Sequence, residues 1–438
     1  MLAVTLSAFW TGCNAAWQKP AVTPVVPSAS GPTPAPSSAA RQPGSAEARL
    51  PPGSHSQAAR LSAAAPWPGS AGVTTDAGTP PTGDPRLAKA REALARQDFR
   101  SAFQECEAAQ KQGVPRPAVL ELKADLFKAT GYLDKEIETV RQWAVAAPRD
   151  QHPWLRLFYI YLDLGWRREA AQASDRALQL APKDARSYVT RALRYYYSSE
   201  PALGLKPIQE ARRLDPANTA LANLHAAILI KTFRFPQAEA ILRKTLERDP
   251  QNVSDRLALA QALLGEGKAQ EAYTELSPVQ QQAPDNLDVA FELGVLAEKR
   301  GDVAEATRQF ERVAAADKHY SNVLWHLGKL YIRQGRAAEG QKLLKTYQTL
   351  DLNTHGYETA LIRLESRPND AGLHYQLAQF HLDAEEFPQA IVELRRVLLL
   401  RPGDARARQA LIAALTRHGR VTEAQRLAAA SSPRRVRQ

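Results

Sequence analysis

The chain has 438 residues, of which 44% are hydrophobic and 24% are charged, and its mean hydropathy is -0.40, a balance that excludes a polytopic membrane protein. Two cysteines, Cys13 and Cys106, are too few for a disulfide-stapled fold or a cysteine-based zinc module. The net charge of +11 is dispersed among interleaved acidic residues, so we do not expect nucleic-acid binding.

Residues 1–13 read MLAVTLSAFWTGC, and their uncharged run is too short to span a bilayer but has the length of a signal-peptide apolar region. The sequence WTGC, with small residues before Cys13, resembles the lipobox of bacterial lipoproteins, in which the cysteine is acylated. Trp10 stands where an aliphatic residue is usual, and no basic residue precedes the run. We expect a lipid on Cys13 and a periplasmic position on an envelope membrane; the alternative is a cytoplasmic protein.

Residues 14–82 contain 13 of the 30 prolines, and Ala, Ser, Gly and Thr make up most of the remainder. Such a composition buries too little apolar surface to offset the entropy of ordering. We therefore expect a disordered linker, which as a flexible coil would reach roughly 45 Å.

The rest of the chain is repetitive. Small side chains recur eight and twenty residues into each unit, with exceptions at Phe158, Ile412 and Glu136, and such residues let paired helices approach closely. Prolines follow short polar or apolar runs at a constant spacing of 34 residues: Pro148, Pro182, Pro216, Pro250 and Pro284. This period is typical of a helix-turn-helix repeat.

The pattern resembles the tetratricopeptide repeat, and the third unit matches the family at Trp154, Leu157, Tyr161, Gly165, Ala170, Ala177 and Pro182. The resemblance implies an all-α superhelical solenoid of about ten units with a concave groove. Eight units occupy residues 83–354, and two more occupy residues 371–438 and end in the basic tail SPRRVRQ. Pro236 and Pro388 fit the first turn of second helices.

The register slips between these two arrays. After Leu352 the next repeat proline, Pro368, follows 16 residues later, not 34. Residues 355–370 resemble the second half of a unit that lacks its first helix. We expect a half-repeat insert there, with a change of curvature.

No motif predicts catalysis. The chain lacks H-E-x-x-H, G-x-S-x-G and a nucleotide-binding glycine loop, and GEGKAQEA at 265–272 reads as an inter-helix turn. His374 and His381 share a helix face without a matching third ligand, so packing is favoured over metal binding. Cys106 occupies an inward position and reads as a small buried hydrophobe. We expect no enzyme activity, cofactor or metal.

Binding is the remaining function class. In this family, peptide partners contact the first helix of each unit along the groove. One candidate patch is aromatic and suits apolar side chains, an extended peptide or a glycan, unless its tyrosines pack on the neighbouring repeat. A second patch is basic and aromatic and suits an acidic peptide, unless it is a solvated helix face. The candidate groove residues are Tyr159, Tyr196 and Tyr197 in the first patch, Trp325, Lys329 and Arg333 in the second, and Asn223, Lys231 and Phe291 between them.

The sequence therefore predicts a non-catalytic interaction scaffold, tethered to a bacterial envelope and similar to the tetratricopeptide lipoproteins that help to assemble protein complexes. Two alternatives stay open: a cytoplasmic adaptor or chaperone-like regulator, and an accessory subunit of a glycan-handling enzyme.

Overall fold

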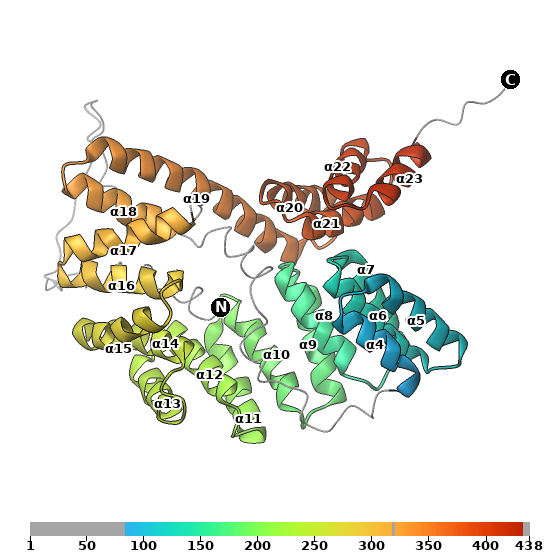
Figure 1. Ribbon diagram of the computed structural model, residues 1–438, viewed down its shortest axis with the longest axis horizontal. Helices are drawn as coiled ribbons and strands as arrows, with labels where there is room; N and C mark the ends of the chain where they lie inside the picture. Colours follow the sequence, from blue (N-terminus) through green and yellow to red (C-terminus); the bar gives the residue numbers. More distant parts are fainter. Residues whose placement is uncertain (1–83, 318–319, 432–438) are drawn as a thin grey trace, which may run out of the picture.

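The structure is a computed structural model that describes residues 84–317 and 320–431 (Figure 1). The expected signal segment 1–13, the expected linker 14–82 and the basic tail lie outside the described residues. Within those residues every regular element is a helix, which confirms the all-α repeat fold.

The helices follow one another as ten pairs joined by short turns, and a short 3-10 turn, η1 (Pro85–Leu87), precedes the first. The fourth pair contains a second 3-10 turn, η2 (Pro201–Gly204), before its second helix. In chain order the pairs are α4 (Ala88–Ala95) with α5 (Phe99–Lys111), α6 (Arg116–Ala129) with α7 (Leu133–Ala146), α8 (His152–Asp163) with α9 (Arg167–Leu180), α10 (Ala185–Tyr196) with α11 (Leu205–Leu214), α12 (Thr219–Lys231) with α13 (Phe235–Arg248), α14 (Val253–Gly265) with α15 (Ala269–Gln282), α16 (Leu287–Arg300) with α17 (Val303–Ala316), α18 (Ser321–Arg333) with α19 (Ala337–Ser366), α20 (Ala371–Asp383) with α21 (Phe387–Leu400), and α22 (Ala405–Arg417) with α23 (Val421–Ser431).

A short proline-containing motif ends one unit and starts the next. Proline two residues past a helix cannot continue it, and the Asn or Asp that follows caps the next helix by accepting a backbone hydrogen bond from its first turn. Six first helices begin in this way, with Asp184, Asn218, Asn252, Asn286, Asp370 and Asp404 as the capping residues. The 34-residue proline spacing is therefore the spacing of helix boundaries.

The two helices of a unit cross at the small residues expected from the pattern. Ala90 and Ala102 of the first unit have no exposed surface, and the same holds for their counterparts Ala226 and Ala238. The exception Glu136 is also buried, and its carboxylate accepts a hydrogen bond from Arg156 Nε at 2.9 Å. Burial raises the pKa of Glu136, although Arg156 acts in the opposite direction.

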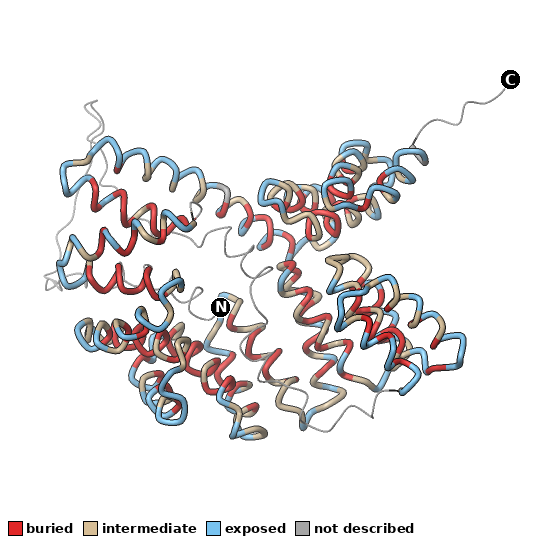
Figure 2. The backbone as a smooth tube through the Cα atoms, in the orientation of Figure 1, coloured by how far each residue is buried: buried red, intermediate tan, exposed pale blue. Residues whose placement is uncertain are grey.

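The register slip appears as a single long helix. Leu352 stands where a repeat proline would end the second helix of the eighth unit, and no proline lies within the 30 residues of α19. The helix therefore continues to Ser366, so the half-repeat expected over 355–370 has no separate helix of its own. In Figure 2 the first part of α19 is mostly exposed, whereas buried residues line its second part, including Tyr357, Ala360, Leu361 and Leu364.

The array curves until its end lies against its beginning. Figure 1 shows the helices from α8 to α19 arranged as a ring, with α19 running across to α20 and α21, which lie beside α7 and α8. The contacts between α7 and α21 join the second unit to the ninth. Residues 198 to 287 positions apart are hydrogen-bonded across this junction, which we call the seam.

Candidate functional site

The first helices of the units form the inner side of the ring. Successive first helices, from α8 through α10, α12 and α14 to α16, contact one another directly. In a curved array the elements on the concave side come closest together, so these contacts identify the inner layer. Every candidate groove residue lies on one of these first helices or on α18, except Tyr197, which directly follows α10.

The aromatic patch is only partly available at the surface. Tyr196 is buried, whereas Tyr159 and Tyr197 are half-buried. The rings of Tyr196 and Tyr197 meet edge to face at 5.0 Å, and the ammonium group of Lys231 lies 4.5 Å from the Tyr196 ring centre. Lys231 Nζ also donates a hydrogen bond to the carbonyl oxygen of Tyr196. Burial, reinforced by Arg167, lowers the pKa of Lys231 to about 8.

The basic patch is more exposed. Lys329 and Arg333 are exposed on α18, and Lys329 Nζ lies 3.9 Å from the centre of the Trp325 ring. Beside them the buried His326 places Nδ1 2.6 Å from Oε2 of Glu298 on α16. A cation over an indole ring, next to a second cation one helical turn away, can receive a carboxylate together with an apolar group.

The other two candidates have different surroundings. Phe291 is 1% exposed and packs against Phe310, Tyr320 and His326, so its side chain is part of the core and not of the groove surface. Asn223 is half-buried and lies within reach of Asp255 on the next first helix. The structure therefore brings together Tyr196, Tyr197 and Lys231, but it does not present all nine residues on one surface.

A buried carboxylate in this inner layer predicts a pH-dependent stability. Glu292 on α16 accepts a hydrogen bond from Gln261 Nε2 at 2.8 Å, and burial raises its pKa to about 7. A raised carboxyl pKa means that the folded state holds a proton that the unfolded state has lost. Between about pH 4.5 and pH 7 this group therefore makes the free energy of unfolding fall as pH rises.

We expect Glu292→Gln to raise the free energy of unfolding at pH 8 by about 1 to 3 kcal/mol and to leave it nearly unchanged at pH 4.5. Urea titrations of both proteins at the two pH values measure this difference. Glu107→Gln, at an exposed position on α5, is the matched control. An equal gain at both pH values would show that the effect is steric and not linked to the proton.

The seam contains a buried polar network that the sequence did not indicate. Trp166, at the start of α9, donates from Nε1 to Oε1 of Glu393 on α21 at 2.6 Å. Oε2 of Glu393 lies 2.5 Å from Nδ1 of His374, whose Nε2 lies 3.0 Å from the carbonyl oxygen of Pro368. Both ring nitrogens face acceptors, an arrangement that suits the imidazolium form. Burial opposes this charge, but the Glu393 carboxylate raises the pKa of His374 overall.

A second set of contacts joins the tenth unit to the second. Arg420 donates to both carboxylate oxygens of Asp134, at 2.6 and 3.0 Å, and Arg395 Nε lies 3.0 Å from the same group. His418 Nε2 lies 3.1 Å from the carbonyl oxygen of Gly131. Burial would raise the pKa of Asp134, but the two arginines lower it overall. The seam is therefore held by groups that are both buried and paired.

The remaining candidates for chemistry have structural roles. His381, like His374, is buried and faces a glutamate, with Nδ1 2.7 Å from Glu386. Cys106 has no exposed surface, and burial raises the pKa of its thiol to about 11. Among the described residues no group of three or more His, Cys, Asp or Glu side chains is placed to hold a metal ion.

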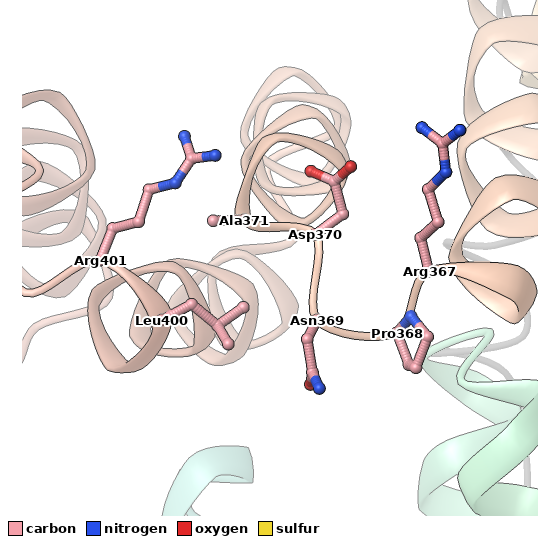
Figure 3. Close-up of a pocket in the computed structure, with 7 residues that line it drawn as sticks. All are labelled: Arg367, Pro368, Asn369, Asp370, Ala371, Leu400 and Arg401. Carbon is pink, nitrogen blue, oxygen red and sulfur yellow. The ribbon is translucent and has the colours of Figure 1, made fainter.

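One open pocket of about 500 Å³ lies at the turn between α19 and α20. Figure 3 shows Arg367 and Arg401 on either side of Asp370, with Asn369 pointing away from them. The Asp370 carboxylate already accepts hydrogen bonds from the backbone N–H groups of Gly372 and Leu373. This pocket is therefore the cleft of a helix-capping turn.

No helix in the part of the chain that the structure describes is both long enough and apolar enough to cross a bilayer. Residues 229–298 and 297–361 match the family model described as tetratricopeptide repeat. The chain is 27% identical to cellulose synthase operon protein C of Pseudomonas fluorescens over 43% of its own length, and the match spans 14% of that protein.

Solved structures are similar over parts of the chain, and two of them serve as examples. A tetratricopeptide repeat protein from Parabacteroides merdae is 14% identical with a TM-score of 0.48, over 57% of this chain and 98% of that one. PilF of Pseudomonas aeruginosa is 18% identical with a TM-score of 0.38, over 45% of this chain and 88% of that one.

Proposed function

Because the chain is a tetratricopeptide repeat protein, we propose that it is a non-catalytic scaffold that holds a protein partner on the inner side of its ring. The observation that supports this most directly is the exposed patch of Lys329 and Arg333 beside Trp325 on α18, the first helix of the eighth unit. A partner segment with a carboxylate next to an apolar side chain fits this patch, since the cations and the indole meet both groups.

Site-specific photo-crosslinking in the native host tests the inner side as the binding surface. A photoreactive amino acid at Lys329 is expected to give a discrete crosslinked partner, because that side chain is exposed on a first helix, the layer proposed to hold the partner. The same amino acid at Lys244, which is exposed on the second helix α13, is the control. Crosslinks of the same partner with equal yield from both positions would contradict the proposal.

We also propose that Cys13 carries a lipid that tethers the ring to the periplasmic side of a bacterial envelope membrane. The support is the WTGC sequence, followed by a proline-rich segment whose composition suits a spacer. Mass spectrometry of the mature N-terminus from the membrane fraction, with Cys13→Ala as the control, tests this. An unmodified N-terminus in the soluble fraction would favour the cytoplasmic adaptor instead.

A second candidate function is that of an accessory subunit in glycan handling. The match to a protein named for a cellulose synthase operon favours it, together with the half-buried Tyr159 and Tyr197. Aromatic rings commonly stack on sugar faces. If this candidate is right, Tyr197→Ala should abolish retardation of the protein in polysaccharide-containing gels without removing the crosslink from position 329.

A further inference from the structure

The seam contains a pocket that exists only because the two ends of the array meet. It has a volume of about 610 Å³ and lies between α7 of the second unit and α21 of the ninth. Trp166 also lines it, and Arg116 contributes from the first turn of α6. The pocket is separate from the inner-layer patches, because none of the nine candidate groove residues lines it.

Part of the pocket lining is aliphatic, and two of these aliphatic side chains are exposed to solvent, where polar residues are usual. Ile137 and Val392 are buried beneath it, whereas Val145 is 82% exposed and Leu399 is 71% exposed. These four residues occur at spacings of eight and seven along their own helices, so each pair lies on one helix face. Exposed aliphatic side chains on two facing helices form a groove that matches the apolar face of a partner helix.

The rim of the pocket carries excess positive charge. Arg116, Arg141, Arg395 and Arg396 line it, against the carboxylates of Asp134 and Glu138. Asp134 is engaged by Arg395 and Arg420, and Arg141 donates from Nε to the hydroxyl of Tyr161. Within residues 84–317 and 320–431, no carboxylate pairs with the three remaining rim arginines, Arg116, Arg141 and Arg396.

One rim arginine also lacks part of its hydrogen bonding. Arg396 donates from Nη2 to Oδ1 of Asn369 at 3.0 Å, but its Nε is buried and has no hydrogen-bond partner among the described residues. A buried donor of this kind destabilises the protein while it stays unsatisfied. An acceptor brought by a ligand would satisfy it.

From this geometry we propose that the seam pocket docks an acidic amphipathic helix of another protein. Leu-type side chains of that helix enter between Val145 and Leu399, and flanking carboxylates pair with Arg116, Arg141 and Arg396. Residues 1–82 and 432–438 do not fit, because the former contain four basic and two acidic residues and the latter contain three arginines and no acid. Because the pocket forms only when the seam is closed, the partner helix binds the closed ring and stabilises it.

Fluorescence anisotropy with a labelled 14-residue peptide tests the proposal. The peptide carries Leu at positions i, i+3, i+4 and i+7 and Glu at most others, and a second peptide replaces each Glu with Lys. We expect the acidic peptide to bind the full chain, with affinity that weakens as salt rises, and the lysine peptide to bind at least tenfold more weakly. Val145→Glu with Leu399→Glu, and separately Arg141→Ala with Arg396→Ala, should each weaken binding at least tenfold.

The controls are Leu352→Glu, at a 72%-exposed position of α19, and Arg248→Ala, at an exposed position of α13. Both variants should bind the acidic peptide like the unaltered chain, while crosslinking from position 329 reports separately on the inner side. Equal binding by all variants, or equal binding of both peptides, would overturn the proposal. A dimer in light scattering that Val145→Glu with Leu399→Glu dissociates would also overturn it, because the groove would then be an interface between copies of this chain.

Discussion

Replacing Glu393 with alanine is expected to weaken both the closure of the ring and the packing of the ninth helix pair. The carboxylate has no exposed surface, and its removal deletes the hydrogen bond from Trp166 and leaves the His374 imidazolium buried without its partner. Removing one member of a buried ion pair typically destabilises by about 3 to 5 kcal/mol. The hydrogen bond from Trp166 crosses the seam, whereas the His374–Glu393 pair joins α20 to α21 inside the ninth unit, so the loss is shared between the seam and that unit.

Small-angle X-ray scattering measures the result as a larger radius of gyration, and circular dichroism should report almost unchanged helix content. Glu393→Gln should have a smaller effect, since its amide oxygen still accepts from Trp166. Glu247→Ala, at an exposed position of α13, is the control. If the radius of gyration of Glu393→Ala matches that of the unaltered chain, the Glu393 network does not hold the seam.

The same network gives the stability of the folded chain a pH dependence with a definite sign. The pKa of His374 is raised in the folded chain, because the pairing with Glu393 outweighs the opposing effect of burial. The stabilisation from its charge is therefore complete below its ordinary pKa of about 6.5 and is lost as pH rises through the raised value. The free energy of unfolding should therefore fall at alkaline pH, and His374→Gln should remove that dependence.

Among the glycines that the structure describes, Gly340 is expected to be the one whose replacement by alanine is most damaging. An added Cβ would lie 2.5 Å from the carbonyl oxygen of Gly328 and 3.1 Å from the backbone nitrogen of Ile332. Both are backbone atoms, so α18 and α19 must move apart. Overpacking of this kind costs about 1 to 3 kcal/mol, and α19 would carry the displacement to the seam.

Thermal unfolding together with scattering measures both effects. Gly403→Ala is the matched control, because nothing lies within 4 Å of an added Cβ there. We expect the melting temperature to fall by several degrees for Gly340→Ala and to stay nearly constant for Gly403→Ala. Equal melting temperatures for the two variants would show that the crossing of α18 and α19 tolerates the extra methyl group.

The repeat pattern predicted the helix pairs because each boundary depends on local chemistry. A proline followed two residues later by Asn or Asp acts on the nearest turn, and small residues at a crossing concern only their own unit. The repeat pattern did not predict that Phe291 and Tyr196 are buried. A groove position and a core position can be neighbouring residues on the same helix, so the pattern alone does not separate them. The absence of proline at Leu352 was visible in the sequence, and it is the physical cause of the long α19.

Closure of the ring could not be predicted in this way. Trp166 and Glu393 are separated by 227 residues, and a 34-residue period describes only how neighbours stack. Whether the ends meet depends on the sum of small rotations over many units. A buried Glu393 between a Trp and a His is visible only once the two arrays are placed against each other.

Because the long helix α19 leads into the seam, the geometry of the seam depends on the number of residues in that helix. Its middle, from about residue 345 to 352, is largely exposed, so tertiary contacts constrain residue identity little there. Each residue of an α-helix turns the following face by about 100° and advances it by about 1.5 Å. Deleting one residue from this stretch would rotate Leu361 away from Gly165 and Glu365 away from Arg167, although no residue at the seam had changed. The identities of the exposed residues in this stretch of α19 can therefore vary. Insertions and deletions there keep the seam only when they restore the angular phase of the helix.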